Sequence, residues 1–134
     1  MLIFIVSFIV FFVHISLIVA ESRSIPVIND LRVGEHVENT RLVVEVSQST
    51  VFRAYMLEDP PRLVVDFPNA RWGATIKEII FNQGLINKAR FGEFGYGTVR
   101  IAIDLSEPAE VANSFVLKSR KSKASRVVID LKGI

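Results

Sequence analysis

Hydrophobic and polar residues alternate along most of the chain after residue 25. In residues 41–46 every even position is aliphatic and points one way, while Arg41 and Glu45 point the other way. The same pattern returns in residues 62–67, 100–105 and 126–131. Strict alternation of this kind predicts a β-strand with one face buried in a core. Further strands are expected at residues 51–57 and 110–118, and in the segments that begin at Ile28 and Ile86.

This pattern occurs twice in the sequence. Residues 28–35 return as residues 86–93, with the same Ile, Asn, Arg, Gly and Glu at matching places. Residues 41–47 then return as 100–106, and residues 62–67 as 126–131. Such a repeat predicts one supersecondary unit used twice, each copy covering the apolar face that the other cannot bury alone. With four strands expected in each copy, the fold class is all-β, a sandwich built by internal duplication.

The expected boundaries follow the repeat. Copy one covers about residues 26–67, a crossover covers 68–85, and copy two covers about 86–132. Within the crossover, residues 74–81 fit either one or two helical turns or a short irregular connection. Pro60 and Pro61 fix the backbone dihedrals of the last turn in copy one, whereas copy two has a longer, basic hairpin at residues 118–125.

Residues 1–20 carry no charge and are almost wholly apolar. We expect residues 1–22 to be a signal peptide, with a small-x-small cleavage site at residues 20–22, or an N-terminal membrane anchor. No Lys or Arg precedes the apolar stretch, and its length of about 20 residues would also span a bilayer, so both interpretations stay open. Either one places residues 23–134 outside the cytoplasm.

The composition of residues 23–134 argues against several classes of function. The net charge of +2 is too small for the strongly basic face of a nucleic-acid-binding domain. His36 is the only histidine after residue 20 and cysteine is absent, so the usual ligands of a catalytic zinc are missing. Asp66 and Asp130 sit beside arginines on expected strands, where cross-strand ion pairs explain them. We therefore expect no catalytic centre, cofactor or metal.

Arginines occupy equivalent places in the two copies, as the pairs Arg32/Arg90, Arg41/Arg100 and Arg62/Arg126. A guanidinium group binds carboxylates through paired hydrogen bonds, which makes these arginines candidates for anion recognition. The alternative is structural, with Glu45 pairing Arg41 and Asp66 pairing Arg62. The basic hairpin is likewise either a solvated loop or a contact for a polyanionic surface. Its cations are Lys118, Arg120, Lys121 and Lys123.

Glycines alternate with aromatic residues over residues 91–97. One interpretation is that Tyr96 and its neighbours stack on sugar rings. The other is that the glycines shape a hairpin tip while the phenylalanines enter the core. Copy one has residues 36–39 (His-Val-Glu-Asn) at this place, so the fold itself does not require the aromatics. Trp72, in the crossover, is expected either to fill the sandwich or to contact a ligand.

Three segments, in order, resemble the AMIN domain. They are Ile-x-x-Leu-Arg-Val from Ile28, Thr-Arg-Leu-Val-Val-Glu-Val at residues 40–46, and Asp-Pro-Pro-Arg-Leu-Val-Val-Asp-Phe at residues 59–67. The resemblance covers about residues 26–132 and implies two four-stranded sheets related by a pseudo-twofold axis. Members of this family stand at the N-terminus of periplasmic N-acetylmuramoyl-L-alanine amidases and of some type IV pilus secretins.

The resemblance implies an exported, periplasmic module that binds peptidoglycan and positions its host at the wall or the division site. The zinc amidase domain of those hosts is not found in this sequence. The alternative is an adaptor that contacts envelope or division proteins through a sheet edge. Membrane contact is expected only through the leader, and nucleic acid is not expected as a partner. The candidate wall-binding residues are Arg32, Arg62, Arg90, Tyr96, Arg100, Lys118, Arg120, Lys121 and Lys123.

Overall fold

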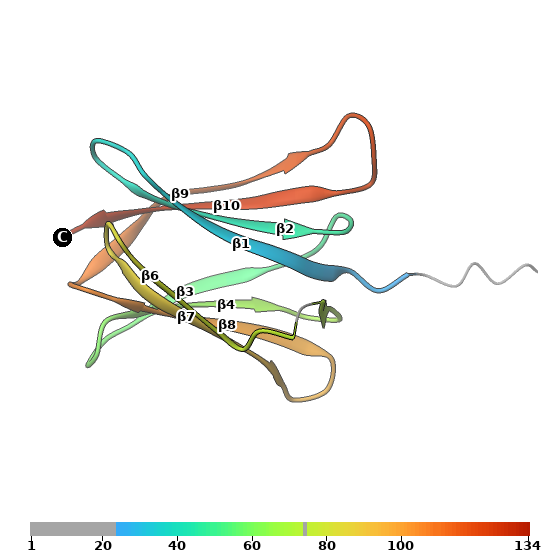
Figure 1. The fold of residues 1–134 in the computed structure, drawn as a ribbon, viewed down its shortest axis with the longest axis horizontal. Coiled ribbons are helices and arrows are strands. Elements are labelled where there is room, and N and C mark those ends of the chain that lie inside the picture. The colour runs from blue at the N-terminus through green and yellow to red at the C-terminus, as the bar shows by residue number, and fades with distance from the viewer. Residues whose placement is uncertain (1–23, 74) are drawn as a thin grey trace, which may run out of the picture.

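A computed structural model of the chain describes residues 24–73 and 75–134, so the leader expected at residues 1–22 lies outside the described residues. Every regular element in the described part is a β-strand (Figure 1), and none of it forms a helix long and apolar enough to cross a membrane. The strands are β1 (Val27–Glu35), β2 (Thr40–Val46), β3 (Arg53–Leu57), β4 (Arg62–Phe67), β5 (Arg71–Trp72), β6 (Glu78–Gln83), β7 (Ile86–Phe94), β8 (Thr98–Leu105), β9 (Ala109–Lys118) and β10 (Ser125–Gly133).

The strands form two five-stranded sheets that pack face to face (Figure 1). Sheet 1 has the order β5-β1-β2-β10-β9, and sheet 2 has the order β3-β4-β8-β7-β6. Neighbouring strands are antiparallel except for the short parallel pair of β1 and β5. The expected all-β sandwich is confirmed. Each sheet holds one strand more than the repeat alone supplies, because the crossover adds β5 to sheet 1 and β6 to sheet 2.

The two copies of the repeat exchange hairpins between the sheets. Copy one places β1–β2 in sheet 1 and β3–β4 in sheet 2, while copy two places β7–β8 in sheet 2 and β9–β10 in sheet 1. Each sheet is therefore joined at its centre by one strand from each copy, β2 with β10 and β8 with β4. These two pairs are equivalent under the pseudo-twofold relation of the repeat. Each five-stranded sheet therefore contains strands of both copies.

Residues 78–81 of the crossover belong to a strand, β6, and do not form the helical turns that were one expectation for residues 74–81. Ile76, Ile79 and Ile80 have helix-like spacing, but Ile79 and Phe81 alternate into the core while Ile80 is exposed. Glu78 pairs with Arg90 on β7, and the segment forms the strand β6 by hydrogen bonding along the edge of β7. Pairing with an open sheet edge outweighs a weak helical pattern in so short a segment.

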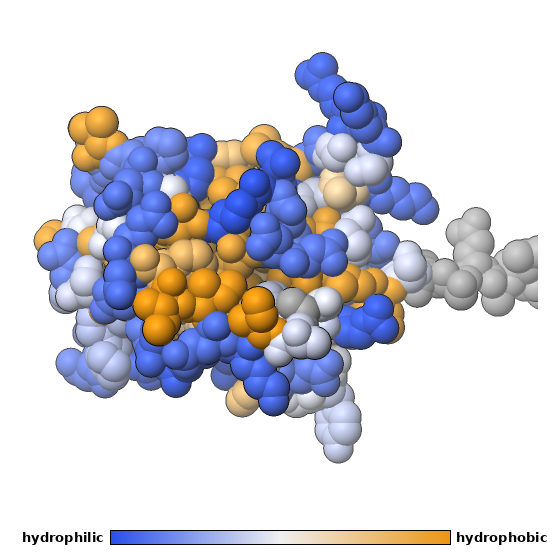
Figure 2. All heavy atoms as spheres, in the orientation of Figure 1, coloured by the Kyte–Doolittle hydropathy of each residue, from blue (hydrophilic) through white to orange (hydrophobic). Residues whose placement is uncertain are grey.

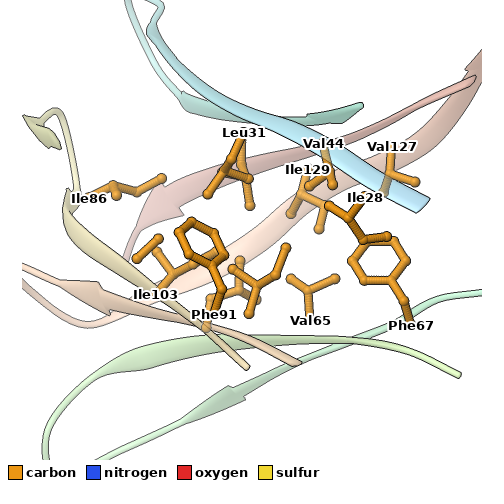
Figure 3. Packing of buried hydrophobic residues seen from close by; sticks show 14 of the residues in the cluster. Ile28, Leu31, Val44, Val65, Phe67, Ile86, Phe91, Ile103, Val127 and Ile129 are labelled. Atoms are coloured by element: carbon orange, nitrogen blue, oxygen red, sulfur yellow. The ribbon is translucent and has the colours of Figure 1, made fainter. Parts of the chain in front are cut away.

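The core lies between the sheets and is built from the alternating aliphatic positions of both copies (Figure 3). Phe67, Ile28 and Ile129 are fully buried there. Fully burying such a side chain contributes roughly 1.5–3 kcal/mol. All buried core residues lie between Ile28 and Leu131, and all strands lie between Val27 and Gly133. The described residues thus contain a continuous hydrophobic core, and we expect residues 24–134 to fold without the residues that precede them.

Candidate functional site

Two bidentate arginine–carboxylate pairs join the copies at the sheet centres. Arg41 on β2 donates from Nε and Nη2 to the two oxygens of Asp130 on β10, at 2.8 and 3.0 Å. Arg100 on β8 donates in the same way to Asp66 on β4, at 2.8 and 2.9 Å. Each pair takes one residue from each copy, so the duplication repeats the contact. The expected pairing of Arg41 with Glu45 is wrong, because β10 places Asp130 directly opposite Arg41.

These contacts shift the protonation equilibria of the pairs. Hydrogen bonding from Arg41 lowers the pKa of Asp130 below its ordinary value, and this effect exceeds the opposing effect of burial. Hydrogen bonding to Asp66 raises the pKa of Arg100, which is already charged at every physiological pH. Both guanidinium forks are therefore occupied by structural partners, and Arg100 is less free to bind a ligand than the sequence suggests.

The shift at Asp130 gives an acid dependence of stability. A carboxyl whose pKa is lower in the folded state stabilises the protein above its unfolded pKa of about 3.9. This contribution disappears as the pH falls through the lower, folded pKa. Between about pH 5 and pH 2, we expect the unfolding free energy of Asp130→Asn to fall less steeply with decreasing pH than that of the wild type. Urea unfolding at a series of pH values measures this. Arg41→Gln should show the same shallower fall, and wild-type slopes in both variants would contradict the assignment.

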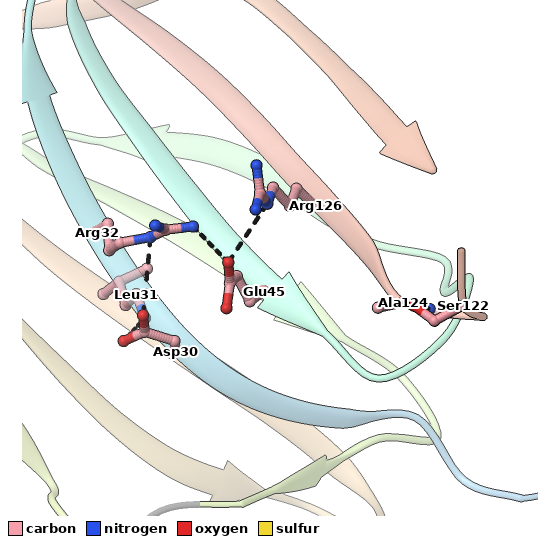
Figure 4. A network of polar contacts seen from close by, with 7 residues as sticks. All are labelled: Asp30, Leu31, Arg32, Glu45, Ser122, Ala124 and Arg126. Atoms are coloured by element: carbon pink, nitrogen blue, oxygen red, sulfur yellow. Dashed lines mark hydrogen bonds and ion pairs between the residues drawn. The ribbon is translucent and has the colours of Figure 1, made fainter. Parts of the chain in front are cut away.

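The outer face of sheet 1 carries a second network, in which two arginines share one carboxylate (Figure 4). Arg32 on β1 donates from Nη2 to Oε1 of Glu45, and Nε of Arg126 on β10 lies 3.3 Å from the same oxygen. Arg32 also lies 3.7 Å from Asp30. The side chains of Arg32 and Arg126 remain about half exposed, at 51% and 57%. Glu45 and Asp30 together balance the charge of the two arginines, so the network by itself is neutral.

Two adjoining hollows flank Arg126 and Leu117 on this face. The first, of about 340 Å³, is lined by Glu45, Leu117, Lys118 and Arg126 among others. The second, of about 330 Å³, is lined by Arg32, Leu117 and Arg126 over the aliphatic side chains Val43 and Val128. Together they form what we call the β10 groove, which has an apolar floor. Its walls supply the cations Arg32, Lys118 and Arg126, with Glu45 in the wall and Asp30 beside Arg32 as the carboxylates.

The equivalent face of sheet 2 differs in charge and shape. Arg90 lies 3.1 Å from Asp104, and Lys88 lies 3.9 Å from the other oxygen of that carboxylate. The guanidinium of Arg100 stacks on Phe94, with its carbon 3.7 Å from the ring centroid. Arg90 and Arg100 thus lie on the opposite face of the molecule from the β10 groove. The structure does not bring them together with Arg32 and Lys118.

Arg62 lies at the turn between β3 and β4, on neither of these sites. Its Nη1 donates to the backbone carbonyls of Pro60 at 2.9 Å and Glu58 at 3.3 Å. The expected pairing with Asp66 is wrong, because Asp66 is held by Arg100. Arg62 closes its own turn. Its repeat equivalent Arg126 lies in the β10 groove instead. That equivalence made Arg126 a candidate for anion recognition, although it was not among the candidate wall-binding residues.

The aromatic-glycine segment divides between core and surface. Phe91 is buried and stacks on Trp72, with ring centroids 4.2 Å apart, so Trp72 fills the sandwich. Tyr96 is fully exposed at the tip between β7 and β8, flanked by Gly95 and Gly97 at φ values of 65° and 74°. The interpretation as a hairpin tip holds for the glycines and for Phe91, whereas Phe94 is exposed, and sugar stacking by Tyr96 stays a prediction. Tyr96 is remote from the β10 groove, because its tip belongs to sheet 2.

The described residues hold no group of three His, Asp or Glu side chains that could bind a metal ion. The arrangement is a duplicated β-sandwich that presents charged grooves and loops on its surface. The model of the AMIN domain family matches residues 30–131, and the chain belongs to this family.

The chain is also similar to the N-acetylmuramoyl-L-alanine amidase AmiC of Neisseria meningitidis serogroup B. The two are 29% identical over 117 residues, which cover 84% of this chain but 28% of the relative. The chain therefore spans less than a third of that amidase.

Proposed function

We propose that this domain is an exported, periplasmic module that binds peptidoglycan and positions an amidase-type activity at the cell wall, without a catalytic centre of its own. The β10 groove carries this proposal. Its cations Arg32, Lys118 and Arg126 outnumber the carboxylates of Glu45 and the neighbouring Asp30 by one, and Lys118 supplies this excess. Peptidoglycan stem peptides present carboxylates, which pair well with guanidinium groups. The apolar floor at Val43 and Val128 suits the aliphatic side chains of the same peptides.

The similarity to an amidase supports a host of that class, because the matched relative acts on N-acetylmuramoyl-L-alanine by its name. A binding domain that holds the polymer on which an attached enzyme acts raises the local concentration of that enzyme at its substrate. Exposed ion pairs contribute at most about 1 kcal/mol each, so a single groove should bind modestly and gain from the many copies of its ligand in the polymer.

Binding should weaken with added salt, because the contacts are exposed ion pairs that salt screens. The test is co-sedimentation of residues 24–134 with protein-free peptidoglycan sacculi at low and high salt. We expect the bound fraction to fall several-fold as the salt rises. Binding that ignores salt would remove the electrostatic account, and no binding at either salt would contradict the proposed ligand.

A second function is favoured by the edge strand β9. This strand has ten residues, pairs only with β10 within its sheet, and exposes Val116 and Leu117 by 38% and 51%. An open edge of this length can pair with a strand of another protein. Under this alternative the domain is an adaptor in the cell envelope. Retention of envelope proteins by the immobilised domain, lost on Ser114→Pro, would favour it over wall binding.

A further inference from the structure

The loops of the sandwich separate by charge between its two ends. Strands alternate in direction, so the connections gather at one end or the other (Figure 1). The loops at the end where the described chain begins carry Lys77, Arg120, Lys121 and Lys123 and no carboxylate. These loops are residues 24–26, 47–52, 68–70, 75–77, 95–97 and 119–124. We call this the basic end.

The loops of the opposite end carry the reverse charge. They are residues 36–39, 58–61, 84–85 and 106–108, and they contain Glu38, Glu58, Asp59 and Glu107, with the side chain of Arg62 folded back on the 58–61 turn. The net charge of only +2 conceals this separation, because four cations and four carboxylates cancel in the sum. Such a charge distribution orients a protein on approach to a negatively charged surface, with the basic end leading.

The basic end also exposes apolar and aromatic side chains. Val51 is 74% exposed, Ile25 is 60% exposed, and Tyr96 is fully exposed at its tip. Figure 2 shows hydrophobic atoms on the right of the molecule, below a projecting hydrophilic tip. Val51 borders an apolar hollow of about 480 Å³ together with Pro26 and Pro68. Single exposed apolar residues are ordinary, but here they share one end with the cations.

These loops form one continuous surface. The backbone N–H of Ala70 donates to the carbonyl of Gly97 at 3.0 Å, which ties the Tyr96 tip to the turn beside Val51. On the other side, the hydroxyl of Ser125 donates to the carbonyl of Gln48 at 3.1 Å, which ties the basic hairpin to the same β2–β3 loop. Ser49 of that loop borders both the apolar hollow and a hollow that contains Lys123.

We propose that the basic end docks on an anionic lipid bilayer. Lys and Arg close to such a surface are attracted to lipid phosphates, while exposed aliphatic side chains and Tyr enter the interfacial region. A polysaccharide wall offers no apolar interior for Val51 and Ile25. The described chain also starts on this end, directly after 23 residues of which the first twenty are uncharged. A retained leader would bring this end to the membrane and leave the outer faces of both sheets free.

The test uses residues 24–134, which lack the leader, in co-sedimentation with vesicles of equal parts phosphatidylglycerol and phosphatidylcholine. We expect binding to these vesicles and none to pure phosphatidylcholine. Val51→Ser should weaken the binding about tenfold, because each methyl or methylene group that enters the bilayer contributes roughly 0.8 kcal/mol. The matched control is Val37→Ser, a fully exposed valine at the tip of the opposite end. This control should change nothing.

A second pair of variants, matched in charge, tests the contribution of the cations. Lys121→Gln should weaken vesicle binding about fivefold, since each cation near an anionic surface contributes about 1 kcal/mol. Lys132→Gln removes the same charge from an exposed site on β10 that is nearer the acidic end, and it should have little effect. Equal losses in either matched pair, or no binding to anionic vesicles at low salt, would overturn the proposal. So would a parallel loss of sacculus binding in Val51→Ser, which would assign this end to the wall.

Discussion

Phe67→Ala is expected to lower the free energy of unfolding by about 3–5 kcal/mol, the range for deleting a buried aromatic ring. Phe67 is fully buried at the end of β4, and its ring lies 6.2 Å from that of Phe52. Small domains have a total stability of about 5–15 kcal/mol, so this loss is a large share. The measurement is urea unfolding followed by the fluorescence of Trp72, the single tryptophan, which stacks on Phe91 in the core.

The repeat supplies a second variant at the equivalent position. Leu131→Ala should cost about 2–5 kcal/mol, because Leu131 is also fully buried and comes from the last strand of copy two. The two losses should appear in one cooperative transition, since each sheet contains strands of both copies. Val37→Ala, at an exposed tip, should stay within about 0.5 kcal/mol of the wild type. Two separate transitions, or a Phe67→Ala loss no larger than that of Val37→Ala, would contradict this account.

The alternation of residue types predicted most strands because each strand buries one face, and that periodicity is local in sequence. A local pattern does not predict which hairpins lie in the same sheet. The exchange of hairpins depends on contacts such as Arg41 with Asp130, which are 89 residues apart. The strand β6 was missed for a related reason. Glu78 to Gln83 becomes a strand only because β7 offers a free edge beside it.

The sequence predicted several residues of the candidate site, but it did not predict which of them lie together in the structure. The repeat marked Arg32 and Arg90 as equivalent, yet their surroundings differ. Arg32 shares Glu45 with Arg126, whereas Arg90 shares Asp104 with Lys88. Equivalent positions of a duplicated fold keep the same backbone while their neighbours diverge. The separation of charge between the ends was equally hidden, because it depends on the direction of every strand and not on any one segment.

Arg32→Gln combined with Arg126→Gln is expected to weaken binding to peptidoglycan sacculi about ten- to thirtyfold. Each exposed ion pair contributes up to about 1 kcal/mol, so the loss of two corresponds to this range. The double variant also leaves Glu45 without its arginine partners, which turns the charge of the β10 groove toward negative. Binding is measured by co-sedimentation at low salt, where screening is weakest.

The pseudo-twofold relation provides the control. Arg90→Gln combined with Arg62→Gln removes the same charge from the equivalent positions of copies two and one, which lie outside the groove. We expect less than about a twofold loss, since neither residue lines the groove. Thermal unfolding of both double variants separates binding from folding, because exposed substitutions should shift stability by no more than about 0.5 kcal/mol. Equal losses of binding in the two variants would mean that contact with the wall is not confined to the β10 groove, and an unchanged affinity in the first variant would remove the β10 groove as the site.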